Sequence, residues 1–178
     1  MTAATLVLGL DISTSGTKAL LMERDGTVVG IAAAEYDFET PHPLWAEQDP
    51  ALWWDAAQQT ISEGLATTGR SADEIAAVGA GGQMHGMVLL DEDDAVIRPA
   101  ILWNDGRTAA QGQAMLEAVG RERFIAITGN DALVSFTATK MLWVREHEPE
   151  LWARARHLLL PKDYVRFRLT GEHALDVN

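Results

Sequence analysis

Short apolar runs separated by polar turns occupy the first third of the chain. Residues 6–10 form a continuous apolar run, typical of a strand buried on both faces. Two further runs, 17–23 and 27–31, flank an Asp-Gly pair at 25–26, which is a tight-turn dipeptide because glycine tolerates positive φ and aspartate bonds its own backbone. The pattern predicts three antiparallel strands in a meander, with a Ser/Thr/Gly-rich loop at one end.

A helical pattern follows a stiff, proline-containing segment at 40–45. The Asp-Pro pair at 49–50 predicts a helix start, since aspartate caps free amides and proline fits the first helical position. The apolar stripe of that helix comprises Trp53, Ala57, Ile61 and Leu65. Ser71 and Glu74 fit a capping box over one short turn, and the run at 75–79 predicts another buried strand.

The second half of the chain changes from strand patterns to helix patterns. Apolar runs at 87–90 and 96–97 flank an acidic turn and predict a β-hairpin. The spacing then becomes helical, with one helix expected through 109–116, one over 140–147 and a third after Pro161. Strands followed by helices indicate an α/β layered domain, and no internal repeat or low-complexity linker interrupts the sequence.

Composition and charge narrow the classes of function. Hydrophobic residues make up 47% and charged residues 22% of the 178 residues, as in an ordinary globular chain. The 14 Lys and Arg against 26 Asp and Glu give a formal charge of −12, which argues against binding to nucleic acid or to an anionic membrane. The sequence contains no cysteine, so disulfides, thiolate catalysis and cysteine-ligated zinc are excluded.

No targeting signal is apparent in the sequence. The N-terminal apolar run lacks a basic segment before it and is interrupted by Asp11, unlike a signal peptide. No stretch approaches the roughly 18 apolar residues that a membrane helix needs. We therefore expect a cytoplasmic protein.

The loop between the first two predicted strands, residues 11–18, is the first candidate site. Its backbone amides and hydroxyls are suited to surround an anion, while Asp11 is suited to orient a metal-bound water and Lys18 to offset phosphate charge. It is not a P-loop, because the Gly-x-x-x-x-Gly-Lys spacing and the following helix are both absent. Taken alone, the segment is equally compatible with an ordinary polar hairpin turn.

Residues 81–86, Gly-Gly-Gln-Met-His-Gly, form the second candidate site and directly follow a predicted strand. Glycine lets a backbone approach a ligand closely, and Gln83 and His85 supply polar groups near a strand end, where α/β proteins tend to bind ligands. A glycine-rich bend with a hydrogen-bonded histidine explains the same spacing, and spacing alone favours that alternative.

The third candidate comprises Trp103, Asn104, Asp105 and Arg107. An indole beside directional polar groups is suited to bind a polyol, which has both apolar and hydroxyl-bearing surfaces. Two alternatives stay open: Asp105 is equally suited to cap the following helix, and Arg107 to pair with a surface acid.

Four segments together resemble the FGGY family of sugar kinases and, within it, the kinases of xylulose. They are Pro-His-Pro-Leu-Trp-Ala-Glu-Gln-Asp-Pro at 41–50, Gln-Met-His-Gly at 83–86, Arg-Pro-Ala-Ile-Leu-Trp-Asn-Asp-Gly-Arg at 98–107 and Leu-Pro-Lys-Asp-Tyr at 160–164. Their order and approximate spacing are those of the N-terminal part of such kinases. The similarity spans nearly the whole chain, from Asp11 to the Leu-Thr-Gly-Glu at 169–172.

The resemblance implies a ribonuclease-H-like, actin-like α/β fold, with residues 1–178 as an incomplete N-terminal domain and ATP and sugar held between two such domains. It identifies segment 11–18 with the first phosphate-binding hairpin and Asp11 with the acid that places Mg²⁺-ATP through water. The residues implied to bind the nucleotide are Ser13, Thr14, Ser15, Gly16, Thr17 and Lys18. Those implied to bind the sugar are Gln83, Met84, His85, Trp103, Asn104 and Asp105.

The reaction implied by the resemblance transfers the γ-phosphoryl group of ATP to D-xylulose or a related ketose, with Mg²⁺ as cofactor. The general-base aspartate and the C-terminal nucleotide-binding domain are expected beyond residue 178, so little activity is expected of the chain alone. Two other interpretations stay open, namely an FGGY kinase of ribulose, gluconate or glycerol, and a non-catalytic sugar-binding or assembly module. We also expect either homodimers, formed through an exposed apolar surface, or pairing with a separate C-terminal half.

Overall fold

The computed structural model describes residues 5–175; the first four and the last three residues lie outside this description. The chain divides into two compact units. We call residues 5–37, 50–83 and 161–175 the sheet unit, and residues 38–49 and 84–160 the helical unit. Each unit is described by itself.

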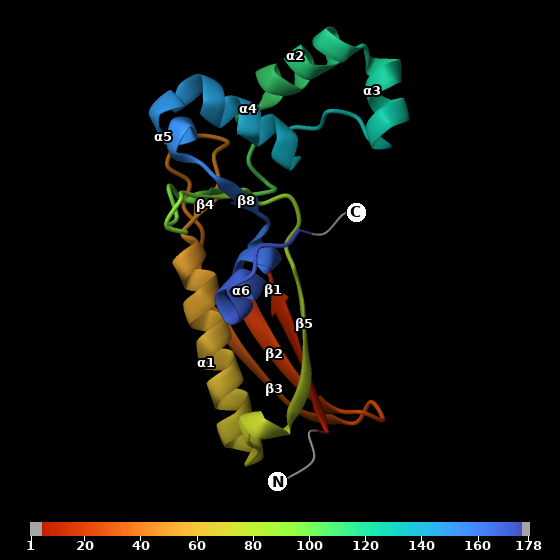
Figure 1. The fold of residues 1–178 in the computed structure, drawn as a ribbon, viewed down its shortest axis with the longest axis vertical. Helices are drawn as coiled ribbons and strands as arrows, with labels where there is room; N and C mark the ends of the chain where they lie inside the picture. The colour runs from red at the N-terminus through yellow and green to blue at the C-terminus, as the bar shows by residue number, and fades with distance from the viewer. Residues whose placement is uncertain (1–4, 176–178) are drawn as a thin grey trace. The chain divides into compact units, whose positions relative to one another are not determined.

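A four-stranded sheet forms the centre of the sheet unit (Figure 1). Its strands are β1 (Leu6–Ile12), β2 (Gly16–Glu23), β3 (Val28–Glu35) and β5 (Ile75–Gly82). In the order β3-β2-β1-β5, the first three strands are antiparallel neighbours and β5 runs parallel to β1. The predicted meander is confirmed.

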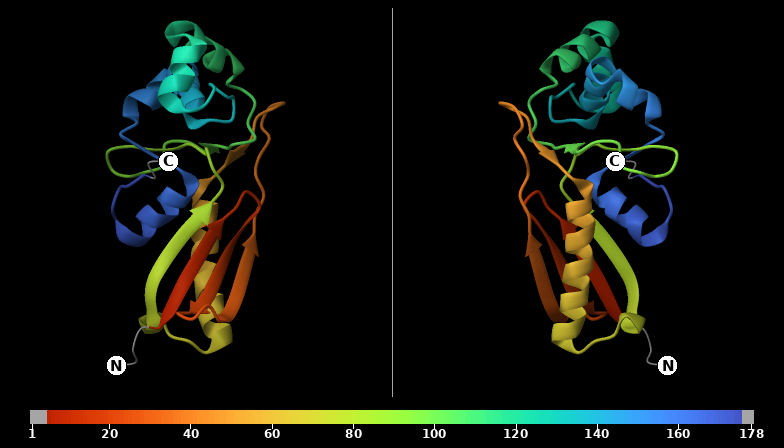
Figure 2. Two further views of the ribbon diagram at one scale, coloured as in Figure 1. Left: turned by 90° about the vertical axis from the view of Figure 1, so that its right-hand side faces the viewer. Right: turned by 90° about the vertical axis from the view of Figure 1, so that its left-hand side faces the viewer.

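Helices α1 (Pro50–Thr68) and α6 (Pro161–Thr170) pack together against this sheet (Figure 2). The residues of β1 that are buried in the core are Leu6, Leu8, Leu10 and Ile12. Trp53 of α1 is fully buried and meets Tyr164 of α6 edge to face, with ring centroids 6.5 Å apart. Helix α1 begins at Pro50, as the Asp-Pro signal predicts.

The prediction of a buried strand after Ser71 is correct in position but wrong in burial. A 3₁₀ turn, η1 (Ala72–Glu74), precedes β5, and the Ser71 amide donates to the Glu74 carboxylate at 3.0 Å, as in a capping box. Strand β5 is largely exposed, with Val78 at 49%. Within the described chain β5 pairs only with β1 and is the edge of the sheet, which explains its exposure.

The helical unit contains four helices and two small antiparallel sheets. The helices are α2 (Ala109–Val119), α3 (Arg121–Thr128), α4 (Thr137–His147) and α5 (Pro149–Arg154). Strand β4 (Glu47–Gln48) pairs with β7 (Ala100–Ile101), and β6 (Val88–Leu90) pairs with β8 (His157–Leu159). The core of this unit comprises Met87, Leu89, Ile101, Trp143 and Val144.

The predicted hairpin is confirmed only in part, because Val96 forms a single bridge with Leu90 while the ladder partner of β6 is the distant β8. The three predicted helices are confirmed as α2, α4 and α6. Helices α3 and α5 were not predicted from the sequence. Within residues 5–175, no helix combines the length and the apolar character needed to cross a lipid bilayer.

Close packing at the end of β5 makes Gly82 sensitive to substitution. A Cβ at Gly82 would lie 2.4 Å from the Ile12 carbonyl oxygen, whereas one at Gly79 on the same strand meets nothing within 4 Å. We expect Gly82→Ala to lower the free energy of unfolding by about 1–3 kcal/mol, measured by urea denaturation. Gly79→Ala is the matched control and is expected to change it by less than about 1 kcal/mol. Equal effects of the two substitutions would contradict the packing described.

Candidate functional site

The turn between β1 and β2 is the predicted phosphate-binding hairpin, and hydrogen bonds hold it firmly. The Ser13 amide donates to the Gly16 carbonyl at 2.9 Å. The Ser13 carbonyl accepts the Tyr36 hydroxyl at 2.8 Å and the Gln83 side-chain amide at 3.4 Å. Side chains from two distant segments therefore fix one peptide group of this turn.

Backbone packing explains glycine at position 16. A Cβ at Gly16 would lie 2.8 Å from the Ala34 carbonyl oxygen on the neighbouring strand. The next residue, Thr17, is fully buried, and its hydroxyl lies 3.0 Å from that of Tyr36. Among the residues predicted to bind nucleotide, Thr17 thus has its side chain in the interior.

Exposed polar groups border the same turn. The antiparallel register places Asp11 directly opposite Lys18, both exposed, and the Ser13 hydroxyl donates to the Asp11 carboxylate at 2.9 Å. The hollow beside the turn, ≈ 240 Å³, is lined by Ser13, Ser15, Gly16, Thr17, Lys18, Ala33, Ala34 and Glu35. It offers hydroxyl groups and an ammonium group to a ligand, beside one carboxylate.

Gln83, which follows β5, is hydrogen-bonded to this hairpin. Its amide donates to the Ile12 carbonyl at 2.8 Å, and the Thr14 hydroxyl donates to its side-chain oxygen at 3.4 Å. Its side chain is buried. Gln83 was predicted among the sugar-binding residues, whereas in the structure its side chain packs against the turn between β1 and β2.

Tyr36 is a residue of this site that the sequence analysis missed. Burial raises the pKa of its phenol to about 12; the Asp11 charge adds to the rise, and the hydrogen bond with Thr17 opposes it. The phenol is therefore neutral at physiological pH and able to donate to the Ser13 carbonyl. No local sequence pattern marks this role, because it depends on the pairing of β2 with β3.

Met84, which is exposed, and His85, which is half-buried, form a turn in the helical unit. The Met84 side chain is 63% exposed, and the Gly86 amide donates to the Met84 carbonyl at 2.8 Å. His85 has φ +60°, a left-handed conformation in which side chains are uncommon. Its ring packs on Phe136 with centroids 4.3 Å apart. Burial lowers the pKa of His85, and the Lys140 charge lowers it further.

The predicted polyol site divides into exposed and buried residues. Trp103 is 45% exposed and Asn104 is also exposed, so both are accessible to a ligand. Asp105 is buried, and its carboxylate accepts hydrogen bonds from the Ala46 amide and from Arg107, each at 2.7 Å. The Asp105 carboxylate is therefore part of the interior of this unit.

The two alternative roles considered for this segment are both wrong. The N-cap of α2 is Thr108, so Asp105 does not cap the helix. Arg107 pairs with Asp105 and Glu47, which are both buried, and not with a surface acid.

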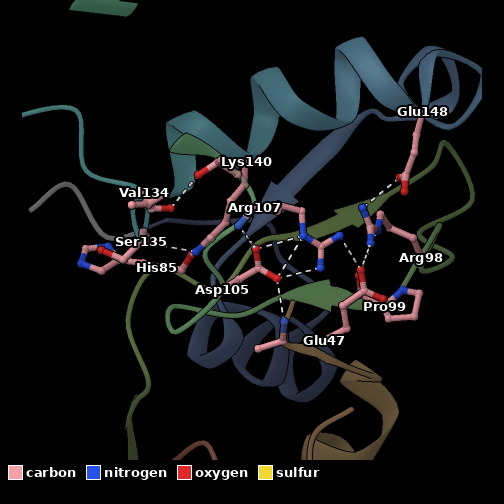
Figure 3. A network of polar contacts seen from close by, with 12 residues as sticks. Glu47, His85, Arg98, Pro99, Asp105, Arg107, Val134, Ser135, Lys140 and Glu148 are labelled. Carbon is pink, nitrogen blue, oxygen red and sulfur yellow. Dashed lines mark hydrogen bonds and ion pairs between the residues drawn. The ribbon is translucent and has the colours of Figure 1, made fainter. Parts of the chain in front are cut away.

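Ion pairs connect Arg107 to a wider network, shown in Figure 3. Its Nη1 lies 2.7 Å from the Glu47 carboxylate, as an ion pair without hydrogen-bond geometry. Glu47 also pairs with Arg98, whose Nη1 donates to Glu148 at 2.8 Å. Burial lowers the pKa of Arg98, while Glu148 and Glu47 oppose this shift. The network joins segment 44–47 to segment 98–107.

Aromatic rings cover the Arg107 guanidinium. Its central carbon lies 3.6 Å from the centre of the Trp45 ring and 4.8 Å from that of Trp143. Cation–π attraction is strongest where water is excluded, as it is around this side chain.

Lys140 is the second residue that the sequence analysis missed as part of a site. It is fully buried, and its Nζ donates to the His85 carbonyl at 2.6 Å and the Ser135 carbonyl at 2.7 Å. A sequence signal exists, since Lys140 shares a helix face with the buried Trp143 and Val144 at i+3 and i+4. A lysine on an apolar helix face indicates a buried hydrogen-bond acceptor, because an unpaired buried ammonium is costly.

A family model for the N-terminal domain of the FGGY family of carbohydrate kinases matches residues 6–178. The chain belongs to this family. The xylulose kinase of Escherichia coli (strain K12) is 43% identical to it over 173 residues, covering 97% of this chain and 35% of that protein. The chain thus spans about a third of the length of the curated relatives it matches.

Solved structures of FGGY kinases share the fold. The xylulose kinase from Rhodospirillum rubrum matches with a TM-score of 0.92 at 36% identity, over 96% of this chain and 35% of that one. The gluconate kinase from Lactobacillus acidophilus matches with a TM-score of 0.85 at 28% identity, over 94% and 33%. The predicted actin-like fold class is confirmed.

The raised pKa of Tyr36 predicts a pH dependence in this FGGY domain. The folded state holds the phenolic proton more tightly than the unfolded state, so the resulting stability is complete below pH 10 and is lost as pH rises towards 12. We expect a phenolate absorbance transition near pH 12 that disappears in Tyr36→Phe. Tyr164→Phe is the control and retains it. A transition near 12 that survives Tyr36→Phe would contradict the assignment.

The buried network predicts that substituting Arg107 lowers stability much more than substituting the exposed Arg121. Arg107→Met leaves two buried carboxylates without their shared partner, and we expect the free energy of unfolding to fall by about 3–5 kcal/mol. Arg121→Met, which breaks the exposed pair with Asp131, is expected to leave the denaturation midpoint nearly unchanged. Urea denaturation of both variants measures the difference, and similar midpoints would contradict it.

Proposed function

We propose that this chain is the N-terminal part of an ATP-dependent kinase that phosphorylates D-xylulose to D-xylulose 5-phosphate. The observation that carries the proposal is the 43% identity to a xylulose kinase along nearly the whole chain. The turn formed by the exposed Met84 and the half-buried His85 supports it, because this is the pair that the resemblance assigns to the sugar.

On the sugar side, the proposal gives direct contacts to four residues. They are Met84, His85, Trp103 and Asn104. Trp103 provides an apolar surface for a sugar face, and Asn104 and His85 provide directional hydrogen bonds. Asp105, predicted as a contact, acts in this proposal by holding its neighbours through Arg107 and the Ala46 amide.

On the phosphate side, the turn after β1 has groups that fit a nucleotide with Mg²⁺. The exposed Asp11 is able to orient metal-bound water, and Lys18 to offset phosphate charge, while the hydroxyls of Ser13 and Ser15 line the adjoining hollow. Gly16 lets the strands approach closely, and the buried Thr17 and Gln83 support the turn from within. ATP, when bound with Mg²⁺, supplies the phosphoryl group.

The chemistry of the proposed reaction depends on positioning. A sugar hydroxyl oxygen forms a bond to the γ-phosphorus of ATP, the bond to the ADP oxygen breaks, and the hydroxyl proton passes to a general base. The proposal assigns that base to none of the residues described here. Asp105 is enclosed by Arg107 and Asp11 lies on the phosphate side, so neither is suited to the role.

Calorimetric titration of the chain with D-xylulose tests the sugar half of the proposal. We expect saturable binding to the parent chain and binding about tenfold weaker to His85→Ala, since the substitution removes a directional hydrogen bond. His173→Ala, at an exposed histidine of the sheet unit, is the matched control and should bind like the parent.

Three competing sugars extend this test. D-ribulose, D-gluconate and glycerol are expected to bind more weakly than D-xylulose. Tighter binding of one of them would reassign the substrate within the family. A folded chain that binds none of the four sugars would contradict a preformed sugar site.

A further inference from the structure

Lys140 occupies an unusual position for a charged side chain. It is fully buried at the start of α4, although a buried ammonium loses favourable hydration. Its Nζ makes short hydrogen bonds to two backbone carbonyls, those of His85 and Ser135. Figure 3 shows the ammonium pointing at the His85 peptide. Lys140 and His85 are 55 positions apart in sequence, so this contact joins two distant segments.

The backbone at His85 needs such support. A residue with a Cβ is disfavoured at φ +60°, and that conformation persists only where the surroundings hold it. Three neighbouring residues of one segment do so. The Thr137 hydroxyl donates to the His85 carbonyl at 3.2 Å, Lys140 donates to the same oxygen at 2.6 Å, and the Phe136 ring packs on the imidazole.

We propose that Lys140 is a positioning residue for the sugar-binding turn. By fixing the carbonyl of His85, its ammonium sets the orientation of the peptide that follows His85 and so presents Met84 and the imidazole to the sugar. Lys140 itself does not touch the ligand. The assignment of the ligand rests on the proposed function, whereas the fixing of the turn is a property of the fold.

The charges around Lys140 make this support sensitive to pH. Burial lowers the pKa of Lys140 to about 7, with Arg107 lowering it further and Asp105 opposing the shift. A charged ammonium is a stronger donor than the neutral amine. The turn should therefore be held best below pH 7. Burial lowers the pKa of His85, which faces Lys140, and the Lys140 charge lowers it further.

The first test substitutes Lys140 with an apolar side chain of similar length. In Lys140→Met we expect D-xylulose affinity to fall about tenfold or more, because a charge-assisted hydrogen bond is lost. The temperature of unfolding should fall only modestly, because the methionine removes a costly buried ammonium but leaves the His85 and Ser135 carbonyls short of a donor. Lys162→Met, at a lysine of the sheet unit paired with Asp163, is the matched control and should bind like the parent.

The second measurement needs no variant. We expect the affinity of the parent chain for D-xylulose to fall about threefold or more as pH rises from 6.5 to 8, as the ammonium loses its proton. Lys140→Met should show no such fall. A purely structural lysine would change stability and affinity in parallel and would leave the pH profile of the folded chain flat.

Amide hydrogen exchange at Gly86 separates this proposal from the function on which it rests. The Gly86 amide is bonded within the turn, so loosening the turn in Lys140→Met should accelerate its exchange about tenfold without any sugar present. Parent-like Gly86 exchange in the variant would overturn the positioning role. Absence of D-xylulose binding to the parent would overturn the proposed function, while exchange would still decide the role of Lys140.

Discussion

The guanidinium of Arg107 is the group on which the helical unit most depends. It binds the Asp105 carboxylate through two nitrogens, pairs with Glu47 and lies against the Trp45 ring. A buried carboxylate without its partner carries a large desolvation cost, so these groups are stable only together. Because Trp45 and Glu47 precede Asp105 by some sixty residues, the network sets the path of two remote segments at once.

Below about pH 7, where Lys140 is protonated, three cations and three carboxylates balance in this region, namely Arg98, Arg107 and Lys140 against Glu47, Asp105 and Glu148. The balance explains how so many charged groups are accommodated beside a core of Met, Leu and Trp. It also explains why the Asp105 side chain is buried although Trp103 and Asn104, just before it, are exposed. The Asp105 carboxylate accepts hydrogen bonds from the buried Arg107 side chain. The exposed side chains of Trp103 and Asn104 are held by a segment whose other residues are fixed in the interior.

Local signals in the sequence predicted most of the regular elements. Tight turns, an Asp-Pro helix start and helical spacing located β1 to β3, α1, α2, α4 and α6, since each depends on neighbouring residues. The two- and three-residue strands β4, β7 and β8 carry too little pattern, and they exist only through pairing with distant partners. The prediction that β5 is buried was wrong for a related reason. An apolar run shows that a strand forms, but its burial depends on what lies on its other edge.

The candidate sites also contain some residues that local sequence signals mark and others that depend on distant contacts. The two turns are held in the same way. Segment 11–18 and the Met84–His85 turn were predicted from residue types, whereas Tyr36, Thr137 and Lys140 were not predicted and Gln83 was predicted as a sugar contact. In each turn one carbonyl oxygen accepts two side-chain donors from remote segments: Tyr36 and Gln83 at Ser13, Lys140 and Thr137 at His85. A turn fixed in this way before ligand binding loses less conformational entropy when the ligand arrives. The residues that shape these turns thus act by donating to backbone carbonyls, and of them only Lys140, on the apolar face of α4, carries a local sequence signal for its role.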